Sequence, residues 1–181
     1  MGRASIGSAQ LAVSPLEYLD VSIVVRKMDE VKKIILVSRC AKTLYQFRAG
    51  LIRKLKNLHY QVIGVGGGGD GFESKILSLG IPFVALPPNR KGINPLGDLR
   101  FFWALVRCYR REKPDIVHHF TIKPVIYGSI AARLAGVPKI INTVTGLGYV
   151  FTSSRRFFLR RLVEQLYRFS LKCAHFTFFQ N

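Results

Sequence analysis

The amino-acid sequence predicts an α/β domain with a doubly wound, mostly parallel, Rossmann-like sheet that carries helices on both faces. The first observation is that short β-branched apolar runs alternate along the chain with segments of helical periodicity. The second is that 49% of the 181 residues are hydrophobic, which is enough to bury a core. The third is that no apolar run reaches the about 18 residues that a membrane-spanning helix needs.

The predicted strands are short runs of apolar, often β-branched residues, a composition typical of strands that are covered on both faces. In parallel α/β sheets, ligands bind outside the carboxyl ends of the strands, so the residues that follow each strand are candidates for function. The six predicted strands are Lys33–Ser38, Gln61–Val65, Pro82–Leu86, Ile116–Phe120, Lys139–Val144 and His175–Phe179.

The predicted helices carry apolar residues at spacings of three and four, with basic residues on the opposite face. Pro95 and Pro114 bound one of them, because proline suits the first helical turn and cannot continue a helix. Gly80 and Gly136 are the expected ends of two others. The five predicted helices are Leu44–Leu58, Phe72–Leu79, Pro95–Glu112, Val125–Ala135 and Arg156–Ala174.

The domain is predicted to occupy residues 33–181, after a poorly patterned leader over residues 1–32. The leader is compatible with disorder and lacks the apolar stretch and cleavage site of a signal peptide. The chain stops directly after the sixth predicted strand, which indicates a domain from a longer protein. Cys40, Cys108 and Cys173 show neither metal-ligand spacing nor a disulfide framework, so we expect reduced thiols, no metal site and no cofactor.

The formal net charge of +18 is concentrated in the second half of the chain. From Asn89 onward there are 16 Lys and Arg residues against four Asp and Glu residues. Nucleic acid, an anionic membrane and phosphorylated substrates are the partners that such a charge attracts. No recognised nucleic-acid-binding module is evident and the basic residues are spread over several elements, so we expect no nucleic-acid partner.

A glycine-rich run follows the second predicted strand. Six of the eight residues from Gly64 to Gly71 are glycine, and the pattern G-x-G-x-x-G fits the run twice. This favours an NAD(P)-binding Rossmann domain as an alternative. However, the helix behind the run is short, and the next strand ends at Asn89 without the carboxylate that holds a ribose. We therefore predict a flexible turn at the carboxyl edge of the sheet, on the rim of the ligand-binding cleft that is expected there.

Four motifs follow one another across the predicted domain. They are GINPLGDL at Gly92–Leu99, DIVHHFTIKP at Asp115–Pro124, NTVTGLGYVF at Asn142–Phe151 and the closing FFQN. With these motifs, residues 33–181 resemble the amino-terminal domain of bacterial family 4 glycosyltransferases, especially the enzymes that build capsule, exopolysaccharide or lipopolysaccharide repeat units. The resemblance implies one half of the two-domain GT-B architecture, in which this half binds the acceptor.

The resemblance also implies a function. It indicates a hexosyltransferase-type enzyme that moves a sugar from a nucleotide-sugar donor, bound through a missing second domain, to a lipid-linked acceptor. It implies contact with an anionic membrane surface, a cytoplasmic location on the inner face of the cytoplasmic membrane, and no activity of the 181-residue chain alone. The alternatives are a non-catalytic remnant, a docking subunit of a split glycosyltransferase, and an NAD(P)-binding domain.

Polar residues gather at the end of the fourth predicted strand. Because side chains alternate along a strand, at most one of His118 and His119 is expected to face the core, while the other can reach the cleft. A neutral imidazole there can hydrogen-bond a sugar hydroxyl or assist proton transfer. Many relatives carry H-x-H, but Phe120 stands at the second place here. We predict His118 and His119 as catalytic residues, and Thr121 and Lys123 as substrate-binding residues, with the lysine neutralising a diphosphate oxygen.

Two further segments are predicted to bind substrate. Thr145, Gly146 and Gly148 follow the fifth strand, where glycines let the backbone approach a ligand and offer amides to phosphate or sugar oxygens. The resemblance implies that Arg39 and Arg48 help to form the acceptor pocket. The non-functional alternatives are a plain strand-to-helix turn and a solvated basic helix face.

A basic segment with aromatic anchors leads into the last predicted helix. Such a segment suits an interfacial membrane helix, because basic groups attract anionic lipids and aromatic rings enter the interface. The alternative is that the apolar face of this helix packs on the sheet. The residues predicted to contact the membrane are Arg155, Arg156, Phe157, Phe158, Arg160 and Arg161.

Overall fold

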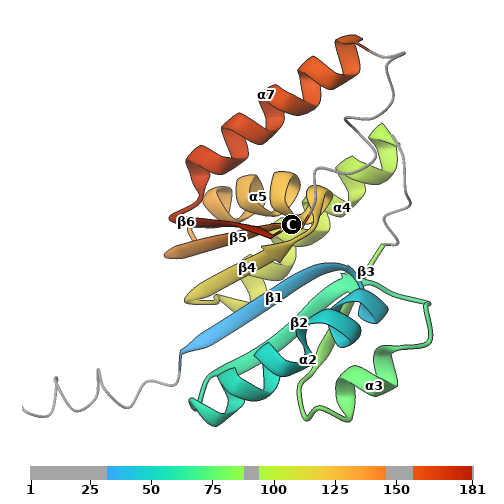
Figure 1. Cartoon of the computed structure of the whole chain (residues 1–181), viewed down its shortest axis with the longest axis vertical. Coiled ribbons are helices and arrows are strands. Elements are labelled where there is room, and N and C mark those ends of the chain that lie inside the picture. The colour runs from blue at the N-terminus through green and yellow to red at the C-terminus, as the bar shows by residue number, and fades with distance from the viewer. Residues whose placement is uncertain (1–31, 88–93, 146–156, 181) are drawn as a thin grey trace, which may run out of the picture. The chain divides into compact units, whose positions relative to one another are not determined.

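The computed structural model describes residues 32–87, 94–145 and 157–180, which form a six-stranded sheet whose neighbouring strands are all parallel. The strand order is β3-β2-β1-β4-β5-β6 (Figure 1). The chain extends the sheet in one direction from β1 and later in the other, so the doubly wound prediction is confirmed. The strands are β1 (Lys33–Cys40), β2 (Gln61–Gly67), β3 (Phe83–Leu86), β4 (Ile116–Phe120), β5 (Lys139–Thr145) and β6 (Phe176–Gln180).

Helices cover both faces of the sheet, as Figure 1 shows. The helices α2 and α3 pack on one face, whereas α4, α5 and α7 pack on the other. None of these described helices combines the length and the apolarity that are needed to cross a membrane. The helical segments are α2 (Ala41–Asn57), α3 (Glu73–Leu77), α4 (Pro95–Glu112), the π-helical turn η2 (Pro124–Gly128), α5 (Ser129–Leu134) and α7 (Phe157–Cys173).

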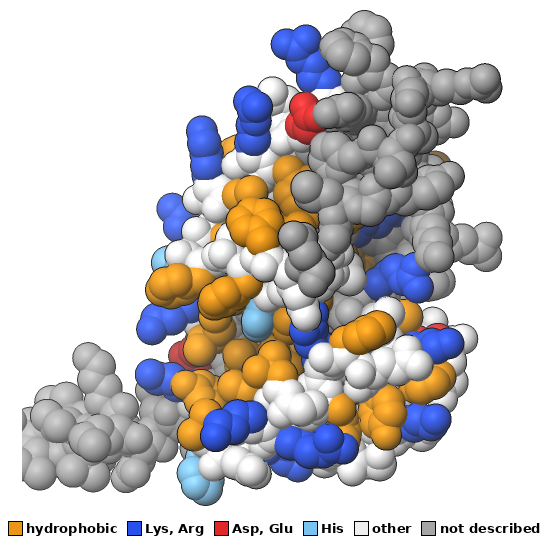
Figure 2. Space-filling model, in the orientation of Figure 1, with side chains coloured by type: hydrophobic (Ala, Val, Ile, Leu, Met, Phe, Trp, Pro, Cys, Tyr) orange, Lys and Arg blue, Asp and Glu red, His pale blue; other side chains and the backbone are white. Residues whose placement is uncertain are grey.

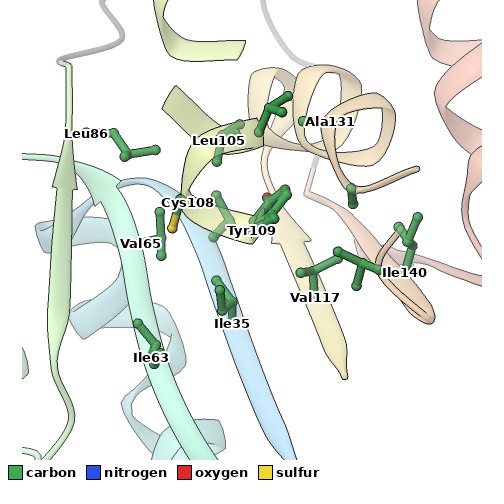
Figure 3. Close-up of a cluster of buried hydrophobic side chains, with 14 of the residues drawn as sticks. Ile35, Ile63, Val65, Leu86, Leu105, Cys108, Tyr109, Val117, Ala131 and Ile140 are labelled. Atoms are coloured by element: carbon green, nitrogen blue, oxygen red, sulfur yellow. The ribbon is translucent and has the colours of Figure 1, made fainter. Parts of the chain in front are cut away.

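The core of the described residues contains three apolar clusters, and the two larger ones lie on opposite faces of the sheet. Along β1, Ile35 and Val37 point to one cluster, while Ile34 and Leu36 point to the other. This alternation follows from the period of two in a strand, and it makes β1 a continuous apolar run buried on both faces. Figure 3 shows the first cluster, in which Ile35 lies beneath the side chains of α4.

The helix α4 begins and ends where the sequence predicts. The Asn94 side-chain oxygen accepts a hydrogen bond from the Gly97 N–H at 3.1 Å, and Pro95 occupies the first turn. Lys113 ends the helix in the left-handed conformation, with φ 46°. The Asn94 cap and Pro95 fix the first turn of α4, which contains Asp98 of the candidate site.

The junction between β1 and α2 differs from the prediction. The strand continues to Cys40 and the helix starts at Ala41, earlier than the predicted Leu44. The Thr43 hydroxyl accepts from the Cys40 N–H at 3.3 Å and donates to the Cys40 carbonyl at 2.9 Å. These bonds satisfy backbone groups at the helix start, so the chain passes from strand to helix without a loop.

The strand β2 also runs further than predicted, to Gly67 instead of Val65. A Cβ atom at Gly66 would lie 2.8 Å from the Ser38 carbonyl oxygen. Glycine therefore lets β2 lie close to the carboxyl end of β1. The predicted boundary is wrong because these glycines serve close packing within the sheet.

The turn after β2 is organised by its own carboxylates. Gly69 has φ 84°, and its N–H donates to the Glu73 carboxylate. Asp70 accepts from the Lys42 N–H at 2.7 Å and from the Phe72 N–H at 3.0 Å. Two negative charges thus stand where a dinucleotide site would hold a pyrophosphate. This favours the interpretation that the glycine run does not bind a nucleotide.

Candidate functional site

The candidate site lies at the carboxyl end of β4, between β1 and β5. In the sheet, His119 pairs with Val37 of β1, and Phe120 pairs with Thr143 of β5. The order of the strands reverses beside β1, so β4 ends at the topological switch point where open α/β sheets bind ligands. The structure therefore brings His118, Thr121 and Lys123 to the expected edge.

His118 lies on the face of the sheet that α2 covers in part. Its Nε2 is 2.8 Å from the Thr143 hydroxyl, and its ring centroid is 4.1 Å from that of Phe120. Burial, together with the nearby His119 and Arg48, lowers the pKa of His118 to about 3. The imidazole is consequently neutral at physiological pH and acts as a hydrogen-bonding group.

His119 points to the opposite face and is 0% exposed. Its Nε2 is 2.9 Å from the Tyr109 hydroxyl and its Nδ1 is 3.0 Å from the Asn142 side-chain oxygen. The Asn142 amide in turn donates to Ser129 at 2.9 Å. Burial lowers the pKa of His119 to about 4. Because both ring nitrogens are engaged inside the protein, the predicted role of His119 at the cleft does not fit this placement.

The turn after β4 contains a strained residue. Thr121 has φ 71°, a left-handed conformation that costs a β-branched residue on the order of 1–3 kcal/mol. Among the described residues, the buried Thr121 hydroxyl has no hydrogen-bond partner. Strain and an unsatisfied buried hydroxyl at a switch point are both typical of a ligand-binding turn.

Lys123 is held by a carboxylate. Its Nζ lies 2.7 Å from Asp98 Oδ1, and the two side chains are only 21% and 8% exposed. The Tyr127 hydroxyl donates to the other Asp98 oxygen at 3.2 Å. Burial and the Asp98 charge raise the pKa of Tyr127 to about 12. Since Asp98 already neutralises the ammonium group, Lys123 is poorly placed to neutralise a diphosphate by itself.

Arg48 connects α2 to two strands. Its guanidinium lies 4.3 Å above the Phe120 ring, and one of its amino groups donates to the Gln180 side-chain oxygen at 3.1 Å. The other predicted arginine, Arg39, is half-buried near the carboxyl end of β1. Thr145 ends β5 and pairs with Gln180.

The face that carries His118 is only partly covered by helices. In β6, Phe176 and Phe178 share this face and are more than half exposed. Figure 2 shows hydrophobic side chains gathered on this side of the molecule, with Lys and Arg side chains around them. The surface therefore offers both apolar contacts and positive charge next to the site.

Several of the residues predicted to bind substrate or membrane lie outside the residues or side chains that the structure describes. Gly146, Gly148, Arg155 and Arg156 fall between the described ranges, and Phe157, Phe158 and Arg160 begin α7 without described side chains. Arg161 is exposed on α7. In the described part of the chain, no group of three or more His, Cys, Asp or Glu side chains could hold a metal ion.

Sequence reasoning missed Asp98, Tyr127 and Thr143. Asp98 belongs to the motif GINPLGDL, and the position of that motif at the start of a helix is a signal that could have found it. The contacts of Tyr127 and Thr143 depend on helix orientation and strand register, which the sequence pattern does not contain.

The order of the all-parallel sheet, with helices on both faces, defines a Rossmann-like α/β domain. Residues 33–181 match the family described as Glycosyl transferase 4-like. The chain belongs to this family, and the resemblance inferred from its motifs is confirmed.

Two curated relatives and one solved structure illustrate the match. The chain is 26% identical over 147 residues to an N,N'-diacetylbacillosaminyl-diphospho-undecaprenol alpha-1,3-N-acetylgalactosaminyltransferase of Campylobacter jejuni subsp. jejuni, covering 80% of this chain and 39% of that protein. It is 36% identical over 89 residues to a UDP-Gal:alpha-D-GlcNAc-diphosphoundecaprenol alpha-1,3-galactosyltransferase of Escherichia coli. This match covers 49% of this chain and 22% of that protein. The chain thus spans less than half the length of either relative.

The solved structure is a UDP-N-acetylglucosamine 2-epimerase, with a TM-score of 0.58 and 16% identity over 81% of this chain and 39% of that one. At this identity the likeness shows the fold alone. Since that protein is named as an epimerase, the fold does not by itself separate epimerisation from sugar transfer.

Proposed function

We propose that this chain is the acceptor-binding part of a glycosyltransferase that moves a sugar from a nucleotide-sugar donor to a lipid-linked glycan during capsule, exopolysaccharide or lipopolysaccharide synthesis. The observation that carries the proposal is the family match over residues 33–181, together with two relatives whose names specify diphospho-undecaprenol acceptors. In this proposal a second domain binds the nucleotide-sugar donor, so we expect the 181 residues by themselves not to transfer sugar.

The acceptor occupies the turn after β4. The Thr121 hydroxyl and the His118 imidazole bind sugar hydroxyls, because both are polar groups at the switch point and the hydroxyl has no partner among the described residues. An imidazole with a pKa of about 3 is a weak base, so His118 orients a hydroxyl and does not abstract its proton.

Positive charge for the acceptor diphosphate comes from the first helix and its surroundings. Arg48 is positioned by Phe120 and Gln180, and a guanidinium binds phosphate oxygens in a bidentate fashion. Lys123 instead maintains the shape of the turn through its contact with Asp98. Thr145 and Arg39 stand at the ends of the neighbouring strands and complete the pocket.

The protein works as a peripheral enzyme on the inner face of the cytoplasmic membrane. This location is supported by the lipid-linked acceptors in the names of the relatives and by the net charge of +18, which attracts anionic lipids.

The proposal is tested by binding of a short-chain, water-soluble prenyl-diphosphate sugar to the chain, measured by calorimetry. We expect Thr121→Ala and Arg48→Ala each to weaken binding by about tenfold, which is about 1.4 kcal/mol. Arg53→Ala, on the exposed side of the same helix, is the matched control and is expected to bind as the unchanged chain does. Unchanged binding in both site variants would refute the site.

A non-catalytic docking subunit is the second candidate, and it would bind the same acceptor. The two are separated by adding a donor-binding domain from a relative and measuring sugar transfer. Transfer that depends on Thr121 supports the enzyme, whereas acceptor binding without transfer supports the docking subunit.

A further inference from the structure

Four buried polar side chains form one chain of hydrogen bonds across the domain. They are Tyr109 of α4, His119 of β4, Asn142 of β5 and Ser129 at the start of α5. None of the four is more than 1% exposed, so each polar group needs a partner inside the protein. The bonds between them therefore join two helices to two neighbouring strands.

The direction in which these groups donate follows from the carboxyl-terminal end of the chain of bonds. The Ser129 hydroxyl has one proton, which goes to its nearest acceptor, the Val125 carbonyl oxygen at 2.6 Å. The Asn142 amide nitrogen donates to Ser129 Oγ at 2.9 Å. The Asn142 amide oxygen lies 3.0 Å from His119 Nδ1. Because this oxygen can only accept, Nδ1 is the imidazole nitrogen that carries the proton.

The other imidazole nitrogen of His119 is consequently an acceptor. Its Nε2 accepts a hydrogen bond from the Tyr109 hydroxyl at 2.9 Å. Burial raises the pKa of Tyr109 and lowers that of His119 to about 4, so both groups are neutral at physiological pH. Each donor then has an acceptor, and donation runs in one direction from α4 to Val125.

This chain of bonds ends at a residue that supports the candidate site. The Val125 carbonyl accepts from the Ser129 hydroxyl, and the Val125 N–H donates to the Thr121 carbonyl at 3.0 Å. Thr121 has the left-handed conformation, and its buried hydroxyl has no partner among the residues that the structure describes. A single residue, Val125, therefore links the buried bonds to the strained turn.

The segment that contains Val125 has an uncommon shape. The turn η2 is π-helical, a form that is rare and that occurs frequently at functional sites. The His119 imidazole packs directly against its backbone, because a Cβ atom at Gly128 would overlap the ring. A serine hydroxyl bonded to the carbonyl four residues earlier also bends a helix, and Ser129 makes this bond. Both contacts favour the π-helical form.

We infer that this chain of bonds, with His119 at its centre, positions the site. It holds η2 in its π-helical form and so keeps Thr121 in the left-handed conformation in which Thr121 binds the acceptor. The inference rests on the proposed function for the nature of the ligand. It makes the buried histidine of the pair a positioning residue, which acts on the acceptor through Thr121 and does not touch it.

The first test uses Ser129→Ala, which removes the bond to the Val125 carbonyl without adding bulk. We expect it to weaken binding of the short-chain prenyl-diphosphate sugar about tenfold in calorimetry. Ile35→Val is the matched control, because Ile35 is equally buried and the change also destabilises the core. The control should keep full affinity, with folding of both variants checked by urea unfolding. An affinity loss that is absent from Ser129→Ala, or equal in both variants, would overturn the inference.

Nuclear magnetic resonance tests the direction of donation without the acceptor. We expect nitrogen-15 spectra to show the Nδ1–H tautomer for His119. His175 is the internal reference and should show the Nε2–H tautomer, because its Nδ1 accepts from the Ile140 N–H at 3.1 Å. An Nε2–H tautomer or a charged ring for His119 at neutral pH would contradict the chain of bonds.

The same spectra test the link to the site. Ser129→Ala should move the backbone resonances of Thr121 away from left-handed values, whereas Ile35→Val should leave them in place. If the unchanged chain does not bind the acceptor but Thr121 responds in this way, the proposed function fails and the positioning of Thr121 stands. If the unchanged chain and Ser129→Ala bind the acceptor equally well, the inference fails and the proposed function stands.

Discussion

The Lys123 ammonium lies 2.7 Å from the Asp98 carboxylate and so joins the turn after β4 to the first turn of α4. We expect Asp98→Asn to lower the free energy of unfolding by about 2–3 kcal/mol, because it removes the negative charge that lies 2.7 Å from a mostly buried ammonium group. Urea unfolding measures the loss. Arg111→Ala, which removes an exposed ion pair with Glu112, is the control and should cost less than about 1 kcal/mol.

A double-mutant cycle with Lys123→Met isolates the interaction. If the pair acts as a unit, the double variant is more stable than the sum of the single losses predicts, by about 1–3 kcal/mol. Additive losses would show that Asp98 supports the fold through Tyr127 alone.

Thr121→Gly is expected to change stability and binding in opposite directions. Glycine adopts a φ of 71° without the steric cost that threonine bears, so the unfolding free energy should rise by roughly 0.5–1 kcal/mol. The same change removes the hydroxyl and should weaken acceptor binding. Thermal unfolding and calorimetry on one preparation test both effects, and a variant that gains stability while keeping full affinity would remove Thr121 from the site.

The glycines at positions 128 and 50 should respond differently to alanine, although both lie in helical segments. A Cβ atom at Gly128 would overlap the His119 imidazole, whereas one at Gly50 meets nothing within 4 Å. We expect Gly128→Ala to destabilise the chain by about 1–3 kcal/mol through overpacking. Gly50→Ala should stabilise it by about 0.5–1 kcal/mol through helix propensity. Chemical denaturation compares them, and equal shifts would contradict the close contact.

Stability should fall as the pH is lowered from about 7 to about 4.5. Burial lowers the pKa of His118 to about 3 and that of His119 to about 4, while an unfolded histidine titrates near 6.5. In this window the unfolded chain binds more protons than the folded one, and each extra proton costs about 1.4 kcal/mol per pH unit. Urea unfolding at several pH values gives the slope. A slope that is identical in His118→Gln would show that His118 does not contribute.

Most elements of the fold were predictable because they depend on local patterns. The strand Ile116–Phe120 and the helix Pro95–Glu112 have the predicted bounds, since an apolar run and a proline with a capping residue mark them. The extension of β2 to Gly67 was missed because glycine normally signals a turn. Here Gly66 is needed because the Ser38 carbonyl oxygen on the neighbouring strand leaves no room for a Cβ atom. This contact joins residues far apart in the sequence, so a local pattern does not reveal it.

The place of the candidate residues at the strand end was predictable, but their contacts were less so. The rule that ligands bind at strand ends led to Thr121 and Lys123. Alternation along β4 required the two histidines to face opposite sides, but it did not say which one faces the core. That choice depends on Tyr109 and Asn142, which come from distant parts of the chain. The partnership of Lys123 with Asp98 is a long-range contact of the same kind.

The buried hydrogen bonds of His119 also help to fix the register between β4 and β5. His119 pairs directly with Asn142, so a slip of β5 by one residue would present Ile141 or Thr143 instead. Such a slip turns every side chain of β5 to the other face and leaves an imidazole nitrogen unsatisfied in the core. Misaligned arrangements are thereby penalised during folding. The carboxyl ends of β4 and β5, which border the candidate site, are thereby held at one fixed stagger.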